Sequence, residues 1–130
     1  MRAVVATAGG AYVVDLDEEE VEPATEDLPS PPLEPDTGLP LVIAAAGAGS
    51  TIVAAVNARP PLVVSHDAGR TWRESGRGLP TGRSVAIAQD DPDLMLFAAR
   101  NRLYVSRDGG RFWRVLTVEL PEIETVVFES

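Results

Sequence analysis

The sequence predicts an all-β protein built from repeated four-stranded antiparallel units, and two observations carry this prediction. The first is a motif that occurs twice with the same residue types in register, at residues 65–72 and 106–113. The second is a series of short apolar or alternating segments bounded by turn residues, at a spacing typical of antiparallel strands. The two motifs lie 41 residues apart. That period is typical of a repeat protein, in which each small sheet buries its face only by stacking on its neighbours.

The unit that holds the second motif defines the expected pattern. Four strands are predicted at 83–88, 94–99, 103–106 and 112–116, with turns at 91–93, 101–102 and 108–110. The preceding unit repeats this pattern with strands at 41–46, 51–56, 61–65 and 71–74. We therefore expect residues 41–80 and 81–121 to form one sheet each.

The two ends of the chain together supply a third sheet. Residues 1–29 are predicted as a degenerate, partial unit with strands at 2–7, 11–14 and 21–25, and they lack both the motif and a first strand. Residues 30–40 are an insertion loop, extended and without regular structure because it is rich in proline. Residues 122–130 alternate in polarity and are rich in β-branched side chains, so they are predicted as one closing strand.

The repeated motif resembles the Asp-box, or bacterial neuraminidase (BNR) repeat, of sialidase-like, sortilin-like and photosystem-assembly-factor-like β-propellers. Its residues in this chain are Ser65, Asp67, Gly69 and Trp72 in one copy and Ser106, Asp108, Gly110 and Trp113 in the other. The resemblance covers residues 41–130 well and residues 1–40 weakly. It implies a single propeller unit in which each predicted sheet is a blade.

The motif itself is expected to be structural. Asp and Ser side chains hydrogen-bond backbone groups of the hairpin, glycine permits a positive φ, and tryptophan supplies apolar area between blades. In the family that the motif resembles, these boxes lie on the face away from catalysis. We therefore assign no catalytic role to Asp67 or Asp108.

Closure of the ring is the open question, since propellers usually have four to eight blades. Three blade equivalents in one chain predict a six-bladed propeller formed by two chains, in which residues 122–130 join the N-terminal blade of the second copy. An unpaired apolar edge strand would otherwise promote aggregation. The alternatives are a fragment of a longer chain or a half-propeller capped by another protein.

Five arginines fall in the loops that share the face opposite the Asp-boxes in a propeller. They are Arg59, Arg77, Arg83, Arg100 and Arg102. Guanidinium groups pair bidentately with carboxylate and phosphate groups, so this rim is a candidate site for an anionic ligand. The structural alternative is that these arginines are solvated or paired with acidic neighbours. The Pro-rich insertion is expected on the same face.

Composition excludes several function classes. The formal net charge is −9, and all of it lies in residues 1–40, which hold ten acidic residues and one arginine. This balance disfavours nucleic acid and anionic membranes as partners. Because the chain has no cysteine and a single histidine, we expect no disulfide, metal site or cofactor. The acidic run at 15–22 lacks the spacing of a calcium loop and is expected to be a solvated hairpin.

Together these features predict a binding or assembly module without catalytic chemistry, which recognises a protein or an anionic small molecule. The short apolar N-terminus and the lack of a long apolar run predict a cytoplasmic protein. The alternative is a glycan-hydrolysing, sialidase-like enzyme or a carbohydrate-binding module. Against catalysis, Tyr12 and Tyr104 occupy matching strand positions, as repeat core residues do, and no carboxylate pair accompanies them at a suitable spacing.

Overall fold

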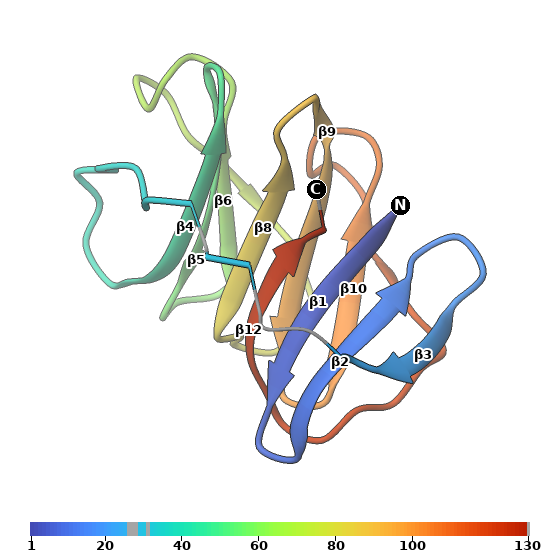
Figure 1. The fold of residues 1–130 in the computed structure, drawn as a ribbon. Helices are drawn as coiled ribbons and strands as arrows, with labels where there is room; N and C mark the ends of the chain where they lie inside the picture. The colour runs from blue at the N-terminus through green and yellow to red at the C-terminus, as the bar shows by residue number, and fades with distance from the viewer. Residues whose placement is uncertain (26–28, 31, 130) are drawn as a thin grey trace.

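The computed structural model describes residues 1–25, 29–30 and 32–129, and these residues form twelve β-strands and no helix (Figure 1). The strands are β1 (Arg2–Thr7), β2 (Gly10–Asp15), β3 (Glu20–Pro23), β4 (Val42–Ala48), β5 (Thr51–Val56), β6 (Leu62–Ser65), β7 (Arg73–Ser75), β8 (Ser84–Ala88), β9 (Asp91–Ala99), β10 (Arg102–Ser106), β11 (Arg114–Val115) and β12 (Ile123–Phe128). The prediction of an all-β protein built from four-stranded antiparallel sheets is confirmed.

The strands form three antiparallel sheets of four strands each. We call them sheet I (order β4-β5-β6-β7), sheet II (β8-β9-β10-β11) and sheet III (β12-β1-β2-β3). Sheet II lies in the middle, because β8 contacts both β4 and β12. The first strands of the three sheets, β4, β8 and β12, run side by side (Figure 1). The result is a stack of three blade-like sheets with its first strands along one side.

The closing strand pairs differently from the expected exchange between two copies. β12 pairs antiparallel with β1 of the same chain, with Val127 opposite Val4, and Ile123 is fully buried. Sheet III is therefore completed within one chain. The reach of the connection explains this, since eighteen residues (24–41) separate β3 from β4. An extended segment of that length spans up to about 60 Å, enough to return from sheet III to sheet I.

Two apolar cores hold the stack together. Between sheets I and II, Val53, Leu62 and Val64 belong to the same cluster as Met95 and Phe97. Between sheets II and III, a second cluster contains Leu94, Leu96, Leu103 and Val105 of sheet II together with Val5, Val14, Leu16 and Ile123. Both faces of sheet II are thus covered, which explains why residues 94–99 are apolar throughout instead of alternating.

Polar contacts at the outer strands tie each pair of sheets together. Trp113 donates from Nε1 to Ser75 Oγ at 2.8 Å, and Ser75 Oγ donates to the carbonyl of Gly110, which joins sheet I to sheet II. The Trp113 ring lies edge-on to Phe97, with centroids 6.2 Å apart.

The acidic hairpin between β2 and β3 joins sheet III to sheet II. Asp17 pairs with Arg107 and Glu19 with Arg114, each at 3.1 Å, and Glu19 also accepts the amide of Thr117 at 2.7 Å. Leu16, in the middle of the acidic run, is fully buried. The hairpin therefore docks on the neighbouring sheet, in contrast to the solvated hairpin expected from the sequence.

Candidate functional site

The first Asp-box is a hydrogen-bonded loop between β6 and β7. Ser65 Oγ donates to Asp67 Oδ1 at 2.8 Å and accepts the amide of Gly69 at 2.8 Å. Asp67 accepts the Thr71 amide at 2.9 Å and the Thr71 hydroxyl at 2.6 Å. Gly69 has a φ of 87°, in the region that favours glycine. These side chains are occupied in shaping the turn.

The second Asp-box repeats the same arrangement. Ser106 Oγ donates to Asp108 Oδ1 at 2.8 Å and accepts the amide of Gly110 at 2.9 Å. Asp108 accepts the amides of Arg111 and Phe112, each at 3.1 Å. Asp67 and Asp108 thus serve as backbone acceptors in equivalent loops, which is the structural role that the motif suggests.

The same hydrogen bonds keep both carboxylates ionised. Donation from the Thr71 hydroxyl and amide and from Ser65 lowers the pKa of Asp67 to about 2. The amide of Phe112 is the main cause of the lowered pKa of Asp108, with further donation from Ser106. A general acid at neutral pH needs the opposite shift, so neither group is suited to that task.

The arginine rim divides into three parts in the structure. Arg59, Arg77 and Arg100 line one hollow of 770 Å³ together with Pro60, Gly78, Leu79, Pro80 and Thr81. Arg83 lies at one end of a different cavity, described below. Arg102 pairs with Glu119 Oε1 at 3.2 Å and donates to the Leu116 carbonyl at 3.1 Å. The structure therefore brings three of the five arginines together.

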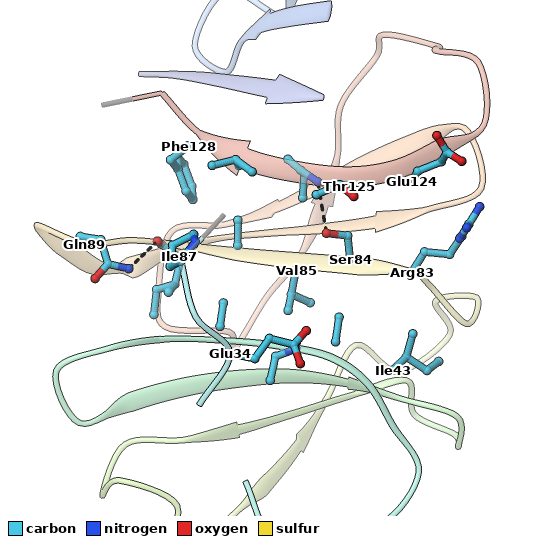
Figure 2. A pocket seen from close by; sticks show the side chains of 17 residues that line it. Glu34, Ile43, Arg83, Ser84, Val85, Ile87, Gln89, Glu124, Thr125 and Phe128 are labelled. Carbon is cyan, nitrogen blue, oxygen red and sulfur yellow. Dashed lines mark hydrogen bonds between the residues drawn. The ribbon is translucent and has the colours of Figure 1, made fainter. Parts of the chain in front are cut away.

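A second cavity, the central groove, runs along the first strands of the three sheets. It encloses 340 Å³ between β4, β8 and β12. Figure 2 shows Arg83 and Glu124 near one end of the groove, Gln89 at the other end, and Glu34 between them. The walls are mainly Val, Ile and Ala side chains, so the groove is apolar with a few separated polar groups.

Several polar side chains in the groove cap the free edges of the first strands. Gln89 Nε2 donates to the Gly47 carbonyl at 3.1 Å, and the Ala45 amide donates to Glu34 at 3.4 Å. Ser84 Oγ accepts the amide of Val126 at 3.1 Å. Such caps satisfy edge groups that would otherwise be open to pairing with another chain. Sequence reasoning missed these groove residues, because nothing in the linear pattern marks an isolated polar residue as an edge cap.

The described residues Pro32 and Glu34 of the Pro-rich segment lie at the central groove together with Arg83, and not at the hollow of Arg59, Arg77 and Arg100, although the sequence placed the segment with all five arginines. Pro32 and Glu34 line the groove, and a Cβ at Gly47 would lie 3.5 Å from Cγ of Pro35. Residues 26–28 and 31 of this segment lie outside the described residues. Pro32 and Glu34 lie on the side from which the chain enters β4.

Neither a cluster of metal ligands nor a membrane-spanning helix occurs in the described ranges. They contain no group of three or more His, Cys, Asp or Glu side chains arranged to hold a metal ion. They also contain no helix of the length and hydropathy that a membrane span requires.

Comparison with known proteins supports the fold. No protein-family model and no curated protein matches this sequence. Among solved structures, the chain is similar to the GH74 enzyme of Niastella koreensis, a propeller, with a TM-score of 0.51 and 20% sequence identity. The match covers 92% of this chain and 18% of that one, so the chain corresponds to a small part of the enzyme's length. At this identity the similarity concerns the fold alone, and we conclude that the chain has a propeller-like all-β fold.

Proposed function

We propose that this protein is a non-catalytic binding and assembly module, in which two copies close a six-bladed β-propeller. Each copy supplies sheets I, II and III and keeps β12 in its own sheet III. Three stacked sheets leave two terminal faces, one on sheet I and one on sheet III, whereas a closed ring leaves none. The partner that we propose for each terminal face is the other terminal face of a second copy.

The observation that carries this proposal is the contrast between the two equivalent tryptophans. Trp113 lies between sheets I and II, where it packs against Phe97 and donates to Ser75. Trp72 occupies the same position one repeat earlier, so it belongs to the side of sheet I that faces away from sheet II. The described hydrogen bonds include none from its indole N–H. Trp113 therefore lies between two sheets of the chain, whereas no sheet of the same chain packs against the side of sheet I to which Trp72 belongs.

The terminal face of sheet I is apolar on β5 and β6 and carries the exposed Glu74 on its outer strand, opposite Val63. Val53, Leu62 and Val64 point into the core shared with sheet II, so the alternation of a strand directs Ala54 and Val63 to the opposite face. End repeats of stacked proteins usually carry a polar outer face, whereas Ala54 and Val63 on the inner strands of this face are apolar.

The terminal face of sheet III is also apolar at its centre. Val5 and Val14 point into the core shared with sheet II, so Val4 and Val13, which pair directly with each other, face the other way. Glu22 lies directly opposite Val13 on the outer strand of this face, where it pairs with Arg2 at 3.7 Å. The two terminal faces continue the packing of sheets I, II and III. A two-fold axis then forms the same contact twice and closes the ring.

A single substitution on the terminal face of sheet I tests this assembly. In light scattering, the unmodified chain is expected to have twice the chain mass of 13.8 kDa. Trp72→Glu is expected to give the single-chain mass, because it places a charge in the apolar contact. Phe112→Ser removes an aromatic ring that is 78% exposed and lies beside Trp113, at the junction of sheets I and II, and it should leave the dimer intact. Circular dichroism checks that each variant is folded.

If Trp72→Glu does not fold, Val13→Asp tests the same contact from sheet III. A single-chain mass for the unmodified protein at high micromolar concentration would overturn the proposal. So would a dimer that both terminal-face substitutions leave unchanged.

Glycan hydrolysis is the second candidate, and the similarity to a GH74 enzyme fits it loosely. That chemistry requires two carboxyl groups on either side of the scissile bond. Glu34 and Glu124 line the central groove, but Glu34 accepts the amide of Ala45 and caps the edge of β4. The groove therefore supports binding better than it supports catalysis.

A further inference from the structure

Three arginine side chains from three separate loops meet in the hollow at the rim of sheets I and II. Arg59 lies between β5 and β6, Arg77 between β7 and β8, and Arg100 between β9 and β10. The other lining residues are Pro60, Gly78, Leu79, Pro80 and Thr81, so no described carboxylate lines the hollow. The hollow is a concentration of positive charge in a chain whose net charge is −9.

Four arginines outside the hollow have acidic partners, whereas the described ion pairs include none of the scattered residues Arg70, Arg73, Arg83 and Arg111. Arg2 pairs with Glu129 at 2.6 Å, Arg102 with Glu119 at 3.2 Å, and Arg107 and Arg114 with the acidic hairpin at 3.1 Å each. Among the described residues, no ion pair involves Arg59, Arg77 or Arg100. In a chain with an excess of carboxylates, three arginines gathered in one hollow without a partner indicate a site for an external anion.

The backbone around the hollow is fixed. The Leu79 amide donates to the Gly76 carbonyl at 3.0 Å, and the Arg83 amide donates to the Ala98 carbonyl at 2.9 Å. These bonds anchor both ends of the loop that carries Arg77. Arg100 has a φ of 56°, a left-handed conformation that favours glycine or asparagine. The two-residue turn between β9 and β10 accounts for this conformation and fixes the point from which the Arg100 side chain leaves the backbone.

We propose that this hollow binds a small molecule with two or more neighbouring oxyanion groups, either phosphates or carboxylates. Guanidinium groups donate two parallel hydrogen bonds to either group, and three of them around one hollow match several oxyanions better than one. All three arginines come from one chain. The site therefore does not depend on the proposed dimer, and it goes beyond the assembly role by giving the module a ligand class.

Titration calorimetry with inorganic pyrophosphate and with citrate tests the site. We expect the unmodified chain to bind at least one of them, and the one that binds identifies phosphate or carboxylate as the ligand group. Arg59→Gln and Arg77→Gln are each expected to weaken that binding by about tenfold or more. Arg70→Gln is the matched control, because it removes the same charge from an exposed residue of the first Asp-box loop. Its affinity should stay within about twofold of the unmodified chain.

Failure of both pyrophosphate and citrate to bind would overturn the inference. An equal loss of affinity in Arg70→Gln would also overturn it, because the attraction would then be general and not local to the hollow. Light scattering on the same samples separates the two proposals. A single-chain protein that binds pyrophosphate would keep the anion site and overturn the assembly.

Discussion

Replacement of Gly82 by alanine is expected to lower the free energy of unfolding by about 3 kcal/mol or more. A Cβ at this position would lie 2.5 Å from the carbonyl oxygen of Ala98 and would overlap the ring of Phe97. Phe97 is fully buried, and Ala98 accepts the amide of Arg83 through that same oxygen. Neither neighbour can move without disturbing the core between sheets I and II or the loop that carries Arg77.

Urea unfolding followed by circular dichroism measures this effect. Gly47→Ala is the matched control, because a Cβ there would meet its neighbours at 3.5 Å, an ordinary contact distance, and its free energy of unfolding should change by less than about 1 kcal/mol. If Gly82→Ala were as stable as Gly47→Ala, this would contradict the close contact between Gly82, in the segment that joins β7 to β8, and β9.

Trp113→Ala is expected to lower the free energy of unfolding of the chain by about 3 kcal/mol. The substitution removes the ring that packs on Phe97 and leaves Ser75, a buried residue, without one of its hydrogen-bond partners. Trp72→Ala makes the same chemical change on the terminal face of sheet I. At concentrations low enough to keep the chains apart, Trp72→Ala should cost about 1 kcal/mol or less.

Chemical unfolding of the two variants at matched low concentration gives this comparison. At high concentration the cost of Trp72→Ala should rise, because the proposed contact between copies is then lost as well. Equal costs for Trp72→Ala and Trp113→Ala at low concentration would contradict the different environments of the two rings.

Strand positions followed well from the sequence where apolar and turn residues alternate clearly. β1 and β5 occupy the predicted residues 2–7 and 51–56. The predicted turn at 91–93 is wrong, because β9 begins at Asp91 and extends beyond the apolar run. Asp and Pro usually favour a turn, but pairing with β8 extends to Asp91, opposite Ala88, where the edge is exposed.

The pairing of β12 did not follow from the sequence. The strand itself is evident from alternation in residues 122–130, and so is its place in an N-terminal sheet that lacks a first strand. Whether it pairs with its own β1 or with that of another copy depends on how far residues 24–41 can reach and where they pass. Neither the reach nor the path of this segment can be derived from the alternation of apolar and polar residues within a strand.

The arginine site was predicted only in part, because its composition also depends on contacts that no local sequence pattern shows. The positions of the loops in the sequence predicted five arginines on one rim. Which of these arginines lie together depends on the residues that surround each of them in the folded chain. Arg102 has Glu119 as its partner, and Arg83 lies in the central groove. The acidic run looked solvated because its partners, Arg107 and Arg114, are about 90 residues away along the chain. Long-range pairs of this kind carry no local signal.

The central claim is that two copies close a six-bladed propeller while each copy keeps β12 in its own sheet III. Its most direct test is a disulfide placed between β1 and β12. Ala6 lies opposite Thr125 in this pair of strands, and the natural chain has no cysteine to compete. The variant with Ala6→Cys and Thr125→Cys is oxidised and its mass is measured twice, by native light scattering and by denaturing, non-reducing electrophoresis. We expect twice the mass of 13.8 kDa in the native measurement and the single-chain mass after denaturation. A single-chain native mass would contradict the six-bladed ring, and a covalent dimer after denaturation would show that β12 is exchanged between copies.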